Sequence, residues 1–366
     1  MAAEAKTPLI TVLGSLNMDL VAYVSHHPLP GETMTSNSFA VSPGGKGANQ
    51  AIACAKLSRS RSSPTSTTST ASASASASAT AHVRMVGAVG ADGYGAQLTA
   101  NLSAHGVDVS GVVSSPGPGN ETGVALIVVD EPTGQNRIIL SPGANHSLPP
   151  ASFAAAALPT ALPAAPAPLL PDLLIMQLEI PLPAVLAALS AARAAGVPVL
   201  LNPAPAQPLP DAAYAGLAHL VLNETEAALL GGVGAAELEA EAGLEGVAAR
   251  FVGLGVRNVI VTLGDRGVFY MTAGSGGAGG RRRRSGLVPA EKAKVVDTTA
   301  AGDTFVGQYA LDVVCAAAGV AKTTTTTTTT EGDFDIEAAV RRANRAAAKT
   351  VERLGAQDSI PWRDEL

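Results

Sequence analysis

Apolar runs of strand length alternate with amphipathic helical patterns along most of the chain, and this alternation constrains the fold more than any other feature. The strand-like runs end in Gly, Asn or Glu and occupy residues 9–14, 82–90, 172–179, 197–202, 219–223 and 258–264. Helical patterns follow several of them, as at residues 183–196 and 245–255. Continuous apolar strands separated by helices are typical of a parallel sheet that is covered on both faces. We therefore predict an α/β fold: a three-layer, doubly wound, mainly parallel sheet with helices on both faces.

Two regions lack a helical period, residues 17–42 and about 107–141. The second contains TGVALIVVDEPTGQNRIILSPG, which alternates around a Pro-Thr-Gly turn and is typical of a β-hairpin. We predict that segments at about 15–45 and 107–141 form a small β-sheet lid. The chain is then a single α/β domain over residues 1–366.

Three low-complexity inserts interrupt the pattern, at residues 58–81, 273–286 and 323–330. The first is rich in Ser and Ala, and because Ala is too small to anchor a strand, its composition favours disorder. Four consecutive arginines (281–284) lie in the second insert. A nuclear or nucleic-acid patch is one interpretation of this run, but a solvated loop is favoured. We predict no part of the site in these inserts.

Composition excludes several classes of protein. The formal net charge of -6 disfavours a nucleic-acid binder, whose surface is expected to be basic. Cys54 and Cys315 lie in apolar helical patterns, which indicates core packing in a reducing compartment. No run of about 18 apolar residues is free of Pro and charge, so we predict no membrane span. Without a basic leader, a cytoplasmic location is expected, a nuclear one is left open, and the final RDEL is interpreted as coincidental.

Residues 295–309 read VVDTTAAGDTFVGQY and place a Gly-Asp pair at the start of an apolar helical run. One interpretation is a helix cap, because Asp and Thr satisfy the first free amides of a helix. The other is an anion site, since exposed amides and the positive end of the helix dipole suit a transferring phosphoryl group. The carboxylate of Asp303 could then accept a proton from an attacking hydroxyl. This stretch alone leaves both interpretations open.

Two further stretches suggest a binding site for a polar ligand. A Gly-Gly-Lys-Gly turn within residues 41–57 lets backbone amides approach a ligand, to which Lys46 and Asn49 can donate. Its spacing matches neither a Walker loop nor a dinucleotide fingerprint. Asn17 and Asp19 follow the first strand and point the same way in an extended chain, as a polyol site requires. Ordinary turns are the alternative interpretation of both stretches.

Together these stretches resemble the ribokinase-type members of the PfkB-type carbohydrate kinase family. The resemblance spans nearly the whole chain apart from the three inserts. The matching motifs, in order, are GSLNMD (14–19), PGGKGANQA (43–51), MQLE (176–179), NPAPA (202–206), NETEA (223–227), VTLGDRG (261–267), DTTAAGDTF (297–305) and GAQDSIPWR (355–363). The AGD turn marks the wider family, and GGKGAN together with NMD is similar to the ribokinase type.

The resemblance implies ATP-dependent phosphorylation of D-ribose at its 5-hydroxyl. Asp303 would be the general base, and the amides of Ala300, Ala301 and Gly302 would form the anion hole. Contacts to the sugar would come from Asn17, Met18, Asp19, Gly45, Lys46, Gly47, Ala48, Asn49, Glu179 and Asp303. Contacts to ATP would come from Asn223, Thr262, Leu263, Gly264, Asp265, Arg266, Gly267, Gly302, Asp303 and Asn344.

The resemblance also implies two metal ions and a partner. Glu226 would act through water on the Mg²⁺ that accompanies ATP. K⁺ would be a monovalent activator, held mainly by backbone carbonyls of Asp297, Thr299, Thr350, Arg353, Gly355 and Ser359. The chain would form a homodimer through its lid sheet. A kinase for deoxyribose or for another pentose or hexose is the nearest alternative, and a non-catalytic sugar or nucleotide binder is the alternative from a different class.

Overall fold

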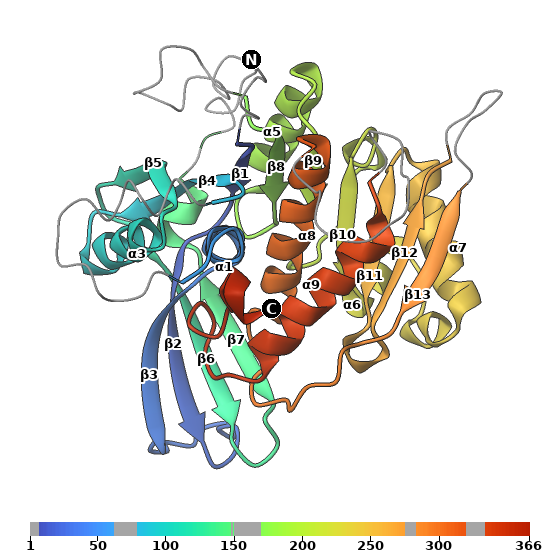
Figure 1. Ribbon diagram of the computed structural model, residues 1–366. Helices are drawn as coiled ribbons and strands as arrows, with labels where there is room; N and C mark the ends of the chain where they lie inside the picture. The colour runs from blue at the N-terminus through green and yellow to red at the C-terminus, as the bar shows by residue number, and fades with distance from the viewer. Residues whose placement is uncertain (1–6, 62–78, 148, 150–169, 275–282, 320–333) are drawn as a thin grey trace.

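A large sheet and a small one form the framework of the protein (Figure 1). The computed structural model describes residues 7–61, 79–147, 149, 170–274, 283–319 and 334–366. The strands are β1 (Leu9–Leu13), β2 (Asn17–Val24), β3 (Ser38–Gly44), β4 (His82–Gly90), β5 (Asp108–Ser115), β6 (Gly123–Asp130), β7 (Asn136–Ser141), β8 (Leu173–Met176), β9 (Val199–Leu201), β10 (His219–Asn223), β11 (Asn258–Thr262), β12 (Val268–Thr272) and β13 (Arg284–Val288). The helices are α1 (Lys46–Leu57), α3 (Gly93–Ala104), α5 (Leu182–Ala194), α6 (Glu224–Gly231), α7 (Glu241–Gly253), α8 (Ala301–Ala317) and α9 (Ile336–Val351). Short 3₁₀ turns are η1 (Gly143–His146), η3 (Asp211–Ala213), η4 (Ala235–Glu239), η5 (Gly264–Arg266) and η6 (Arg363–Glu365).

The large sheet has the strand order β13-β12-β11-β10-β9-β8-β1-β4-β5. From β11 to β5 the neighbouring strands pair in parallel, whereas β12 is antiparallel to both of its neighbours. Every residue of β1, β8 and β9 is buried, as expected for strands covered on both faces. The predicted α/β fold with a mainly parallel sheet is therefore confirmed.

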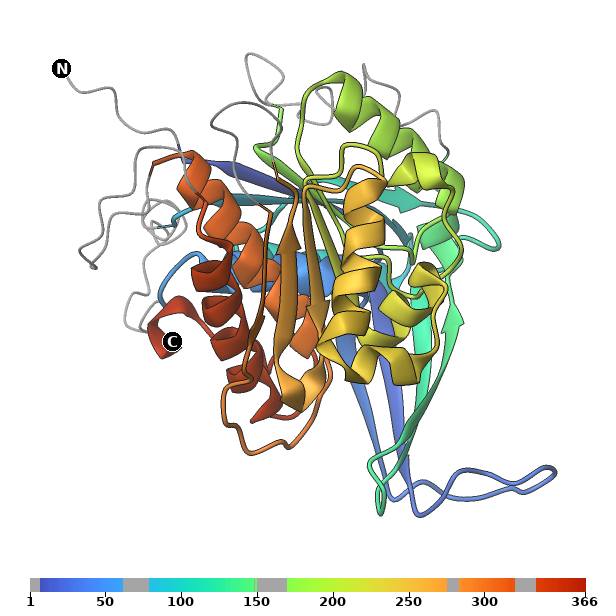
Figure 2. The same cartoon turned by 90° about the vertical axis from the view of Figure 1, so that its right-hand side faces the viewer.

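Helices cover both faces of this sheet, and each face has its own apolar core. Ile10 and Val12 of β1 point to the side of α1, α8 and α9, where they join a cluster that includes Phe305 and Tyr309. Leu13, together with residues of β8, β10 and β11, joins a second cluster with α5, α6 and α7. Figure 2 shows the sheet between α8 and α9 on one side and α5, α6 and α7 on the other.

The small sheet has the strand order β3-β2-β6-β7 and projects from the end of β1 where the parallel strands finish. Strands β6 and β7 form the hairpin predicted around the Pro-Thr-Gly turn. The prediction that all of residues 107–141 belongs to the lid is wrong for its first part, because β5 pairs with β4 as the edge strand of the large sheet. A strand pattern does not reveal which sheet a strand joins, since pairing depends on distant residues.

The three predicted inserts lie largely outside the described residues. The eight threonines at 323–330 are wholly outside, and so are Arg281 and Arg282. The second insert extends too far in the prediction, because Arg284 begins β13, which pairs with β12. Within the described ranges, no helix is both long enough and apolar enough to cross a membrane.

Helices α1 and α8 touch closely at one glycine. A Cβ atom on Gly307 of α8 would lie 2.5 Å from the Cβ of Ala53 and 3.0 Å from the backbone nitrogen of Cys54, both on α1. Interiors packed this tightly tolerate added atoms only by displacing their surroundings. The side chain missing at Gly307 therefore sets how closely the two helices approach each other at this crossing.

We predict that Gly307→Ala lowers the free energy of unfolding by about 1–3 kcal/mol, because the added methyl group overpacks this contact. Gly246→Ala is the matched control, since Gly246 is an exposed glycine of α7 whose added Cβ would meet nothing within 4 Å. It should stabilise the protein by about 0.5–1 kcal/mol through helix propensity. Denaturant titrations of both variants measure the difference, and equal shifts would contradict the packing argument.

Candidate active site

The first turn of α8 presents backbone amides beside a carboxylate. Ala300 is the N-cap residue and has a positive φ of 60°, a conformation that L-residues rarely adopt. The amides of Gly302 and Asp303 have no hydrogen-bond acceptor among the described residues, as expected for the first residues of a helix. Free N–H groups and the positive end of the helix dipole together favour an anion at this position.

Asp303 is 7% exposed, and both of its carboxylate oxygens accept hydrogen bonds from α1. Asn49 Nδ2 donates to Asp303 Oδ2 at 3.0 Å, and Gln50 Nε2 donates to Asp303 Oδ1 at 2.9 Å. Both contacts are amide N–H groups that donate to the carboxylate, which leaves the side chain in the role of hydrogen-bond acceptor. The geometry therefore suits a buried proton acceptor better than a simple helix cap, since the donors that the described residues offer to the Asp303 side chain come from α1 and not from the amides of α8.

A second carboxylate, Glu179, accepts hydrogen bonds from several residues that follow β1. Its Oε2 accepts hydrogen bonds from Ser15 Oγ at 2.5 Å and from the Lys46 amide at 3.0 Å. Asn17 Nδ2 approaches the same oxygen at 3.5 Å, while Asn17 Oδ1 accepts from Asn145 Nδ2 at 2.7 Å. Glu179 thus connects the end of β8 to the start of β2 and to the first turn of α1.

The glycine turn fits against the backbone of the first strand. Gly45 has a φ of 86°, and a Cβ there would lie 2.6 Å from the amide nitrogen of Asn17. A Cβ on Gly47 would lie 2.6 Å from the amide nitrogen of Ser15. Only glycine therefore permits this approach. Met18 and Ala48 are 0% and 1% exposed and belong to the core, so neither side chain lines the site.

Carboxylates outnumber cations in this region. Burial, followed by the nearby carboxylates of Glu179 and Asp303, raises the pKa of Asp19 to about 7 despite the opposing effect of Lys46. Burial lowers the pKa of Lys46, but the surrounding carboxylates, Asp303 first among them, outweigh burial and raise this pKa above its ordinary value. A cation held among several carboxylates, with amide donors beside it, makes a suitable binding site for a ligand rich in hydroxyl groups.

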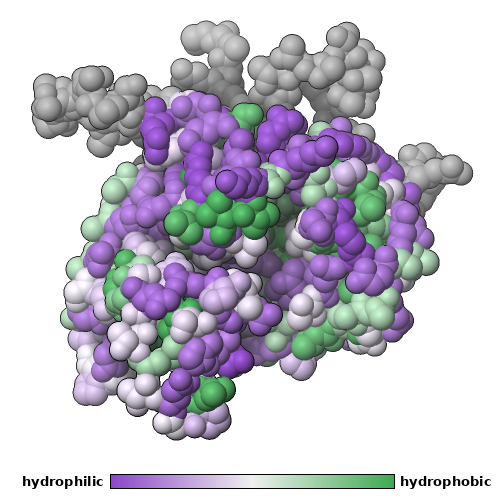
Figure 3. Space-filling view, turned by 90° about the horizontal axis from the view of Figure 1, so that it is seen from below, coloured by the Kyte–Doolittle hydropathy of each residue, from purple (hydrophilic) through white to green (hydrophobic). Residues whose placement is uncertain are grey.

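Two cavities meet at the first turn of α8. The smaller has a volume of about 210 Å³, and its wall includes Lys46, Glu226 and Asp303. The larger, of about 550 Å³, lies between η5 and the chain that leads into α8. Both are lined by Thr262, Thr298 and Gly302. The parallel strands end on the side facing down in Figure 1, and the surface seen from there is hollowed near its centre (Figure 3).

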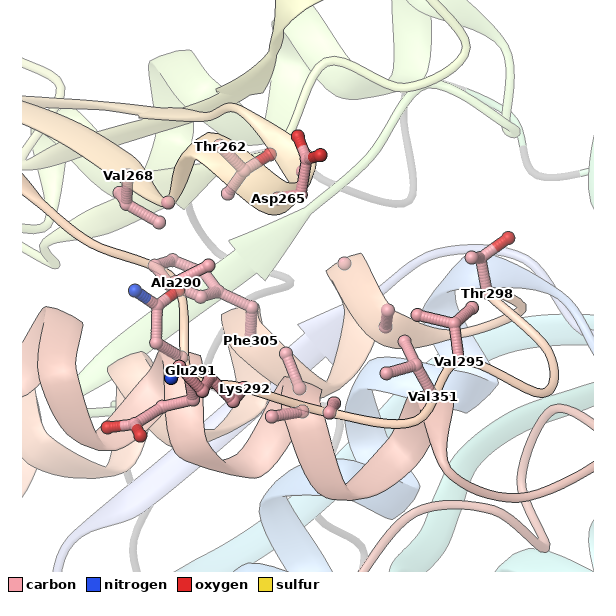
Figure 4. Close-up of a pocket in the computed structure, with 18 residues that line it drawn as sticks. Thr262, Asp265, Val268, Ala290, Glu291, Lys292, Val295, Thr298, Phe305 and Val351 are labelled. Atoms are coloured by element: carbon pink, nitrogen blue, oxygen red, sulfur yellow. The ribbon is translucent and has the colours of Figure 1, made fainter.

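The larger cavity is mostly apolar and has the size of a nucleotide-sized ligand site. Figure 4 shows Thr262 and Asp265 on one side, facing Phe305 and Val351 across the cavity. Asn344 also lines it, and its Nδ2 donates to the carbonyl of Pro289 at 3.2 Å. A flat apolar ring with a few polar edges would fit between these walls.

The predicted nucleotide residues divide into three groups. Those that line the larger cavity are Thr262, Gly264, Asp265, Gly267, Gly302 and Asn344. Asn223 and Asp303 line the smaller cavity, where Glu226 accepts from the Asn223 amide at 2.8 Å and from Asn223 Nδ2 at 2.9 Å. The other two side chains point elsewhere: Leu263 is buried in the core, and Arg266 pairs with Glu224.

The residues predicted to surround a monovalent cation come from two segments that meet. Asp297 Oδ1 accepts from the amide and hydroxyl of Thr299, and Asp297 Oδ2 accepts from the Gly355 amide at 2.9 Å. The amide of Asp297 donates to the carbonyl of Val351 at 3.2 Å. Thr350 Oγ1 donates to Thr304 Oγ1 at 2.9 Å, next to Asp303 in sequence. The Arg353 guanidinium pairs with Glu365, and Ser359 Oγ donates to the carbonyl of Ala356.

Several buried amides around the site were missed by sequence reasoning. Gln50 donates to both Asp303 and Asn202, and it accepts from Gln177 Nε2 at 2.6 Å. Asn145 ties η1 to the start of β2 through three hydrogen bonds to Leu16 and Asn17. Gln50, Gln177 and Asn202 stand inside the quoted motifs, so their motif membership was the available signal, whereas Asn145 had none.

Comparison with known proteins agrees with this geometry. Residues 7–363 match the model of the pfkB family carbohydrate kinases. The ribokinase of Schizosaccharomyces pombe is 38% identical over 96% of this chain and 94% of its own length. A deoxyribokinase of Salmonella typhimurium is 31% identical over 96% of this chain and 95% of its own length.

A solved structure is similar over the same extent. The Arabidopsis thaliana ribokinase complexed with ribose and ATP has a TM-score of 0.74 at 27% identity, covering 98% of this chain and 97% of that one. Its sequence identity is modest, but the match extends over nearly the whole of both chains. The chain belongs to the pfkB family of carbohydrate kinases.

Proposed function

We propose that this protein transfers the γ-phosphoryl group of ATP to the 5-hydroxyl of D-ribose, giving D-ribose 5-phosphate. It is then a phosphotransferase with an alcohol group as acceptor, and the whole chain acts as one kinase domain with the small sheet as its lid. The observation that carries the proposal is Asp303, a buried carboxylate at the mouth of α8 where the two cavities meet. The similarity to ribokinases, one of them solved with ribose and ATP, supports the choice of substrates.

Asp303 acts as the general base. A primary hydroxyl is a poor nucleophile at neutral pH, so a carboxylate within hydrogen-bond reach removes its proton as the oxygen attacks. The new bond joins the sugar oxygen to the γ-phosphorus, the bond from that phosphorus to the bridging oxygen breaks, and ADP leaves. Asn49 and Gln50 hold the carboxylate in one orientation while this occurs.

The amides of Ala300, Ala301 and Gly302 are proposed to form the anion hole. Among the described residues the Gly302 amide has no acceptor, whereas the Ala301 amide also donates to the Thr298 carbonyl at 3.3 Å. Phosphoryl transfer depends on positioning and on stabilising charge at the equatorial oxygens, and fixed N–H groups do both. Lys46 contributes a positive charge on the wall of the smaller cavity. ATP lies in the larger cavity, with Thr262, Gly264, Asp265 and Gly267 along one side, and Asn344 beside the adenine. The backbone of Leu263 and Arg266 completes this segment.

Sugar hydroxyls are bound by Asn17, Asp19, Asn49, Glu179 and the turn from Gly45 to Ala48, including Lys46. These groups supply acceptors and donors in a buried site, as a polyol requires. The carboxylate of Glu226, on the wall of the smaller cavity, has the oxygen donors that Mg²⁺ prefers and would hold, through water, the Mg²⁺ that accompanies ATP. The ion would supply positive charge to the phosphates.

The choice of sugar has a named alternative. A deoxyribose kinase differs from a ribose kinase by one or two contacts, and one relative is a deoxyribokinase. Another pentose or hexose, or a binder without catalysis, are further outcomes. Product formation with a panel of sugars and ATP decides between them: faster turnover of 2-deoxyribose than of ribose would favour the alternative, and no product from any sugar would favour the binder.

We infer that the small sheet also pairs two chains into a homodimer. Phe39 and Val41 of β3, and Ile138 to Leu140 of β7, are exposed on its edge strands. Exposed apolar residues on open strand edges favour pairing with another sheet. A single-chain mass in analytical ultracentrifugation would contradict this.

A cytoplasmic location is proposed as well, since Cys54 and Cys315 are both free; cell fractionation would test it.

Asp303→Asn should lower kcat by roughly two to four orders of magnitude, the usual range for loss of a general base. The amide cannot accept the hydroxyl proton, but it keeps the shape of the side chain, so the fold and ATP binding should be retained. Steady-state turnover and nucleotide titration measure the two properties separately. Near-normal turnover would remove Asp303 from the role of base.

Asp19→Asn should stabilise the ligand-free protein above pH 7. The pKa of Asp19 is raised by burial, so in the folded state this group holds its proton up to about pH 7, whereas the unfolded chain loses it at about pH 4. Ionised Asp19 therefore opposes folding at high pH, and the variant should gain roughly 1–3 kcal/mol at pH 8. The gain should vanish as the pH falls towards about 4, and the KM for ribose should rise more than that for ATP. Melting curves across pH test the sign.

K⁺ is proposed to raise activity by ordering the loop before the anion hole. Asp297 joins this loop to the segment that follows α9, and the carbonyls of Thr299, Thr350, Arg353, Gly355 and Ser359 could then face one ion, a donor set that suits a large, weakly hydrated cation. Turnover at constant ionic strength should be higher in KCl than in LiCl, and Asp297→Asn should reduce that difference. Wild-type rates that do not depend on the cation would exclude the site.

A further inference from the structure

A chain of three side-chain amides leads from α3 to one oxygen of Asp303. Asn101 Nδ2 donates to Gln357 Oε1 at 2.6 Å, and Gln357 Nε2 donates to Asn49 Oδ1 at 3.0 Å. Asn49 Nδ2 then donates to Asp303 Oδ2 at 3.0 Å. Gln357 belongs to the segment after α9 and is 4% exposed, so water has little access to the middle of this chain.

A second chain reaches the other oxygen from the residue after β8. Gln177 Nε2 donates to Gln50 Oε1 at 2.6 Å, and Gln50 Nε2 donates to Asp303 Oδ1 at 2.9 Å. Both glutamines are 0% exposed. Gln177 reaches this position only because residue 14 is glycine: a Cβ on Gly14 would overlap its Oε1.

The direction of both chains follows from the charge at their end. An ionised carboxylate accepts hydrogen bonds and donates none, so each amide that touches Asp303 must turn its nitrogen towards it. The oxygens of Asn49 and Gln50 then face away from Asp303, and the next amide can only approach them with its own nitrogen. By the same rule, Asn101 must turn its side-chain nitrogen towards the oxygen of Gln357.

We propose that Gln357, with Asn101 behind it, and Gln177 are positioning residues for the base, acting through the orientation of Asn49 and Gln50. Each outer amide occupies the oxygen of the inner one, which prevents the inner amide from rotating its oxygen towards Asp303. A rotated amide would place a partial negative charge against the carboxylate and remove one of its donors. This role rests on the proposed function of Asp303 as a general base.

If this role is correct, replacing the Asn101 donor by an acceptor must lower kcat more than removing the donor does. Asn101→Asp keeps the size of the side chain but offers only acceptors to Gln357. Gln357 would turn its nitrogen to the new carboxylate and its oxygen to Asn49, and Asn49 would in turn present its oxygen to Asp303. Asn101→Ala only leaves Gln357 Oε1 without this donor, and because Asn101 is partly exposed, water can replace it.

The test compares kcat of Asn101→Asp with that of Asn101→Ala at one pH and with saturating substrates. We expect kcat of the Asp variant to be about tenfold or more below that of the Ala variant, the size of one charged hydrogen bond, with KM for ATP unchanged within about twofold. A merely structural role predicts the opposite order, because Asp preserves packing and Ala does not. Equal rates, or a lower rate for Ala, would overturn the proposal.

Gln357→Glu and Gln357→Met form a second pair of variants. We expect kcat of the Glu variant to be below that of the Met variant, and equal rates or a lower rate for Met would overturn the proposal. If the buried glutamate prevents folding, the Asn101 pair still decides. A spectroscopic measurement separates this proposal from the proposed function. In protein labelled with ¹⁵N on asparagine side chains, the Asn49 signal, assigned by its loss in Asn49→Ala, should move in Asn101→Asp and stay in Asn101→Ala. A signal that stays in both contradicts the chain even if no sugar is phosphorylated.

Discussion

The close contact between α1 and α8 is the constraint on which the site depends. Gly307 lets α8 approach the backbone of α1 at Ala53 and Cys54, and the first turns of the two helices consequently meet. Asn49 and Gln50 come from one of these turns and Asp303 from the other. The positive ends of both helix dipoles point towards the same small volume, which is a favourable place for negative charge. The proposed anion hole and the proposed base both depend on this meeting of the two helices, so one packing contact positions both.

Negative charge nevertheless exceeds positive charge at this place. Asp19, Glu179, Glu226 and Asp303 surround Lys46, and the raised pKa of Asp19 records the resulting repulsion together with burial. Such a site costs free energy in the ligand-free protein, because its carboxylates outnumber the cations and hydrogen-bond donors that the protein supplies as partners. A sugar with several hydroxyl donors supplies some of these partners, so ligand binding relieves part of a cost already present in the folded protein. Functional sites commonly reduce stability in this way.

Local patterns in the sequence predicted the layers of the fold and the turn that carries Asp303. The strands of the large sheet are apolar throughout, and the Ala-Gly-Asp turn has a recognisable composition, so both are visible without knowledge of distant contacts. The sheet that β5 joins was not predictable, because pairing with β4 is a tertiary property. Gln177 and Gln357 stand inside the quoted motifs, but their contacts were missed for a similar reason, because the role of an amide arises only where residues far apart in the chain meet. The side chains of Met18, Ala48 and Leu263 lie in the core, although their motifs predicted ligand contacts.

The segment after α9 connects two parts of the site that the sequence suggested separately. The amide of Gly355 donates to Asp297, in the loop that leads to the proposed anion hole. Two residues later the side chain of Gln357 donates to Asn49, which in turn donates to Asp303, the proposed base. Lys56 Nζ fixes the same segment by donating to the carbonyl of Gln357 at 3.1 Å. A displacement of this segment would therefore disturb the anion hole and the base together. The proposed proton acceptor, Asp303, and the amides of the proposed anion hole would then respond as one unit, as an in-line transfer requires.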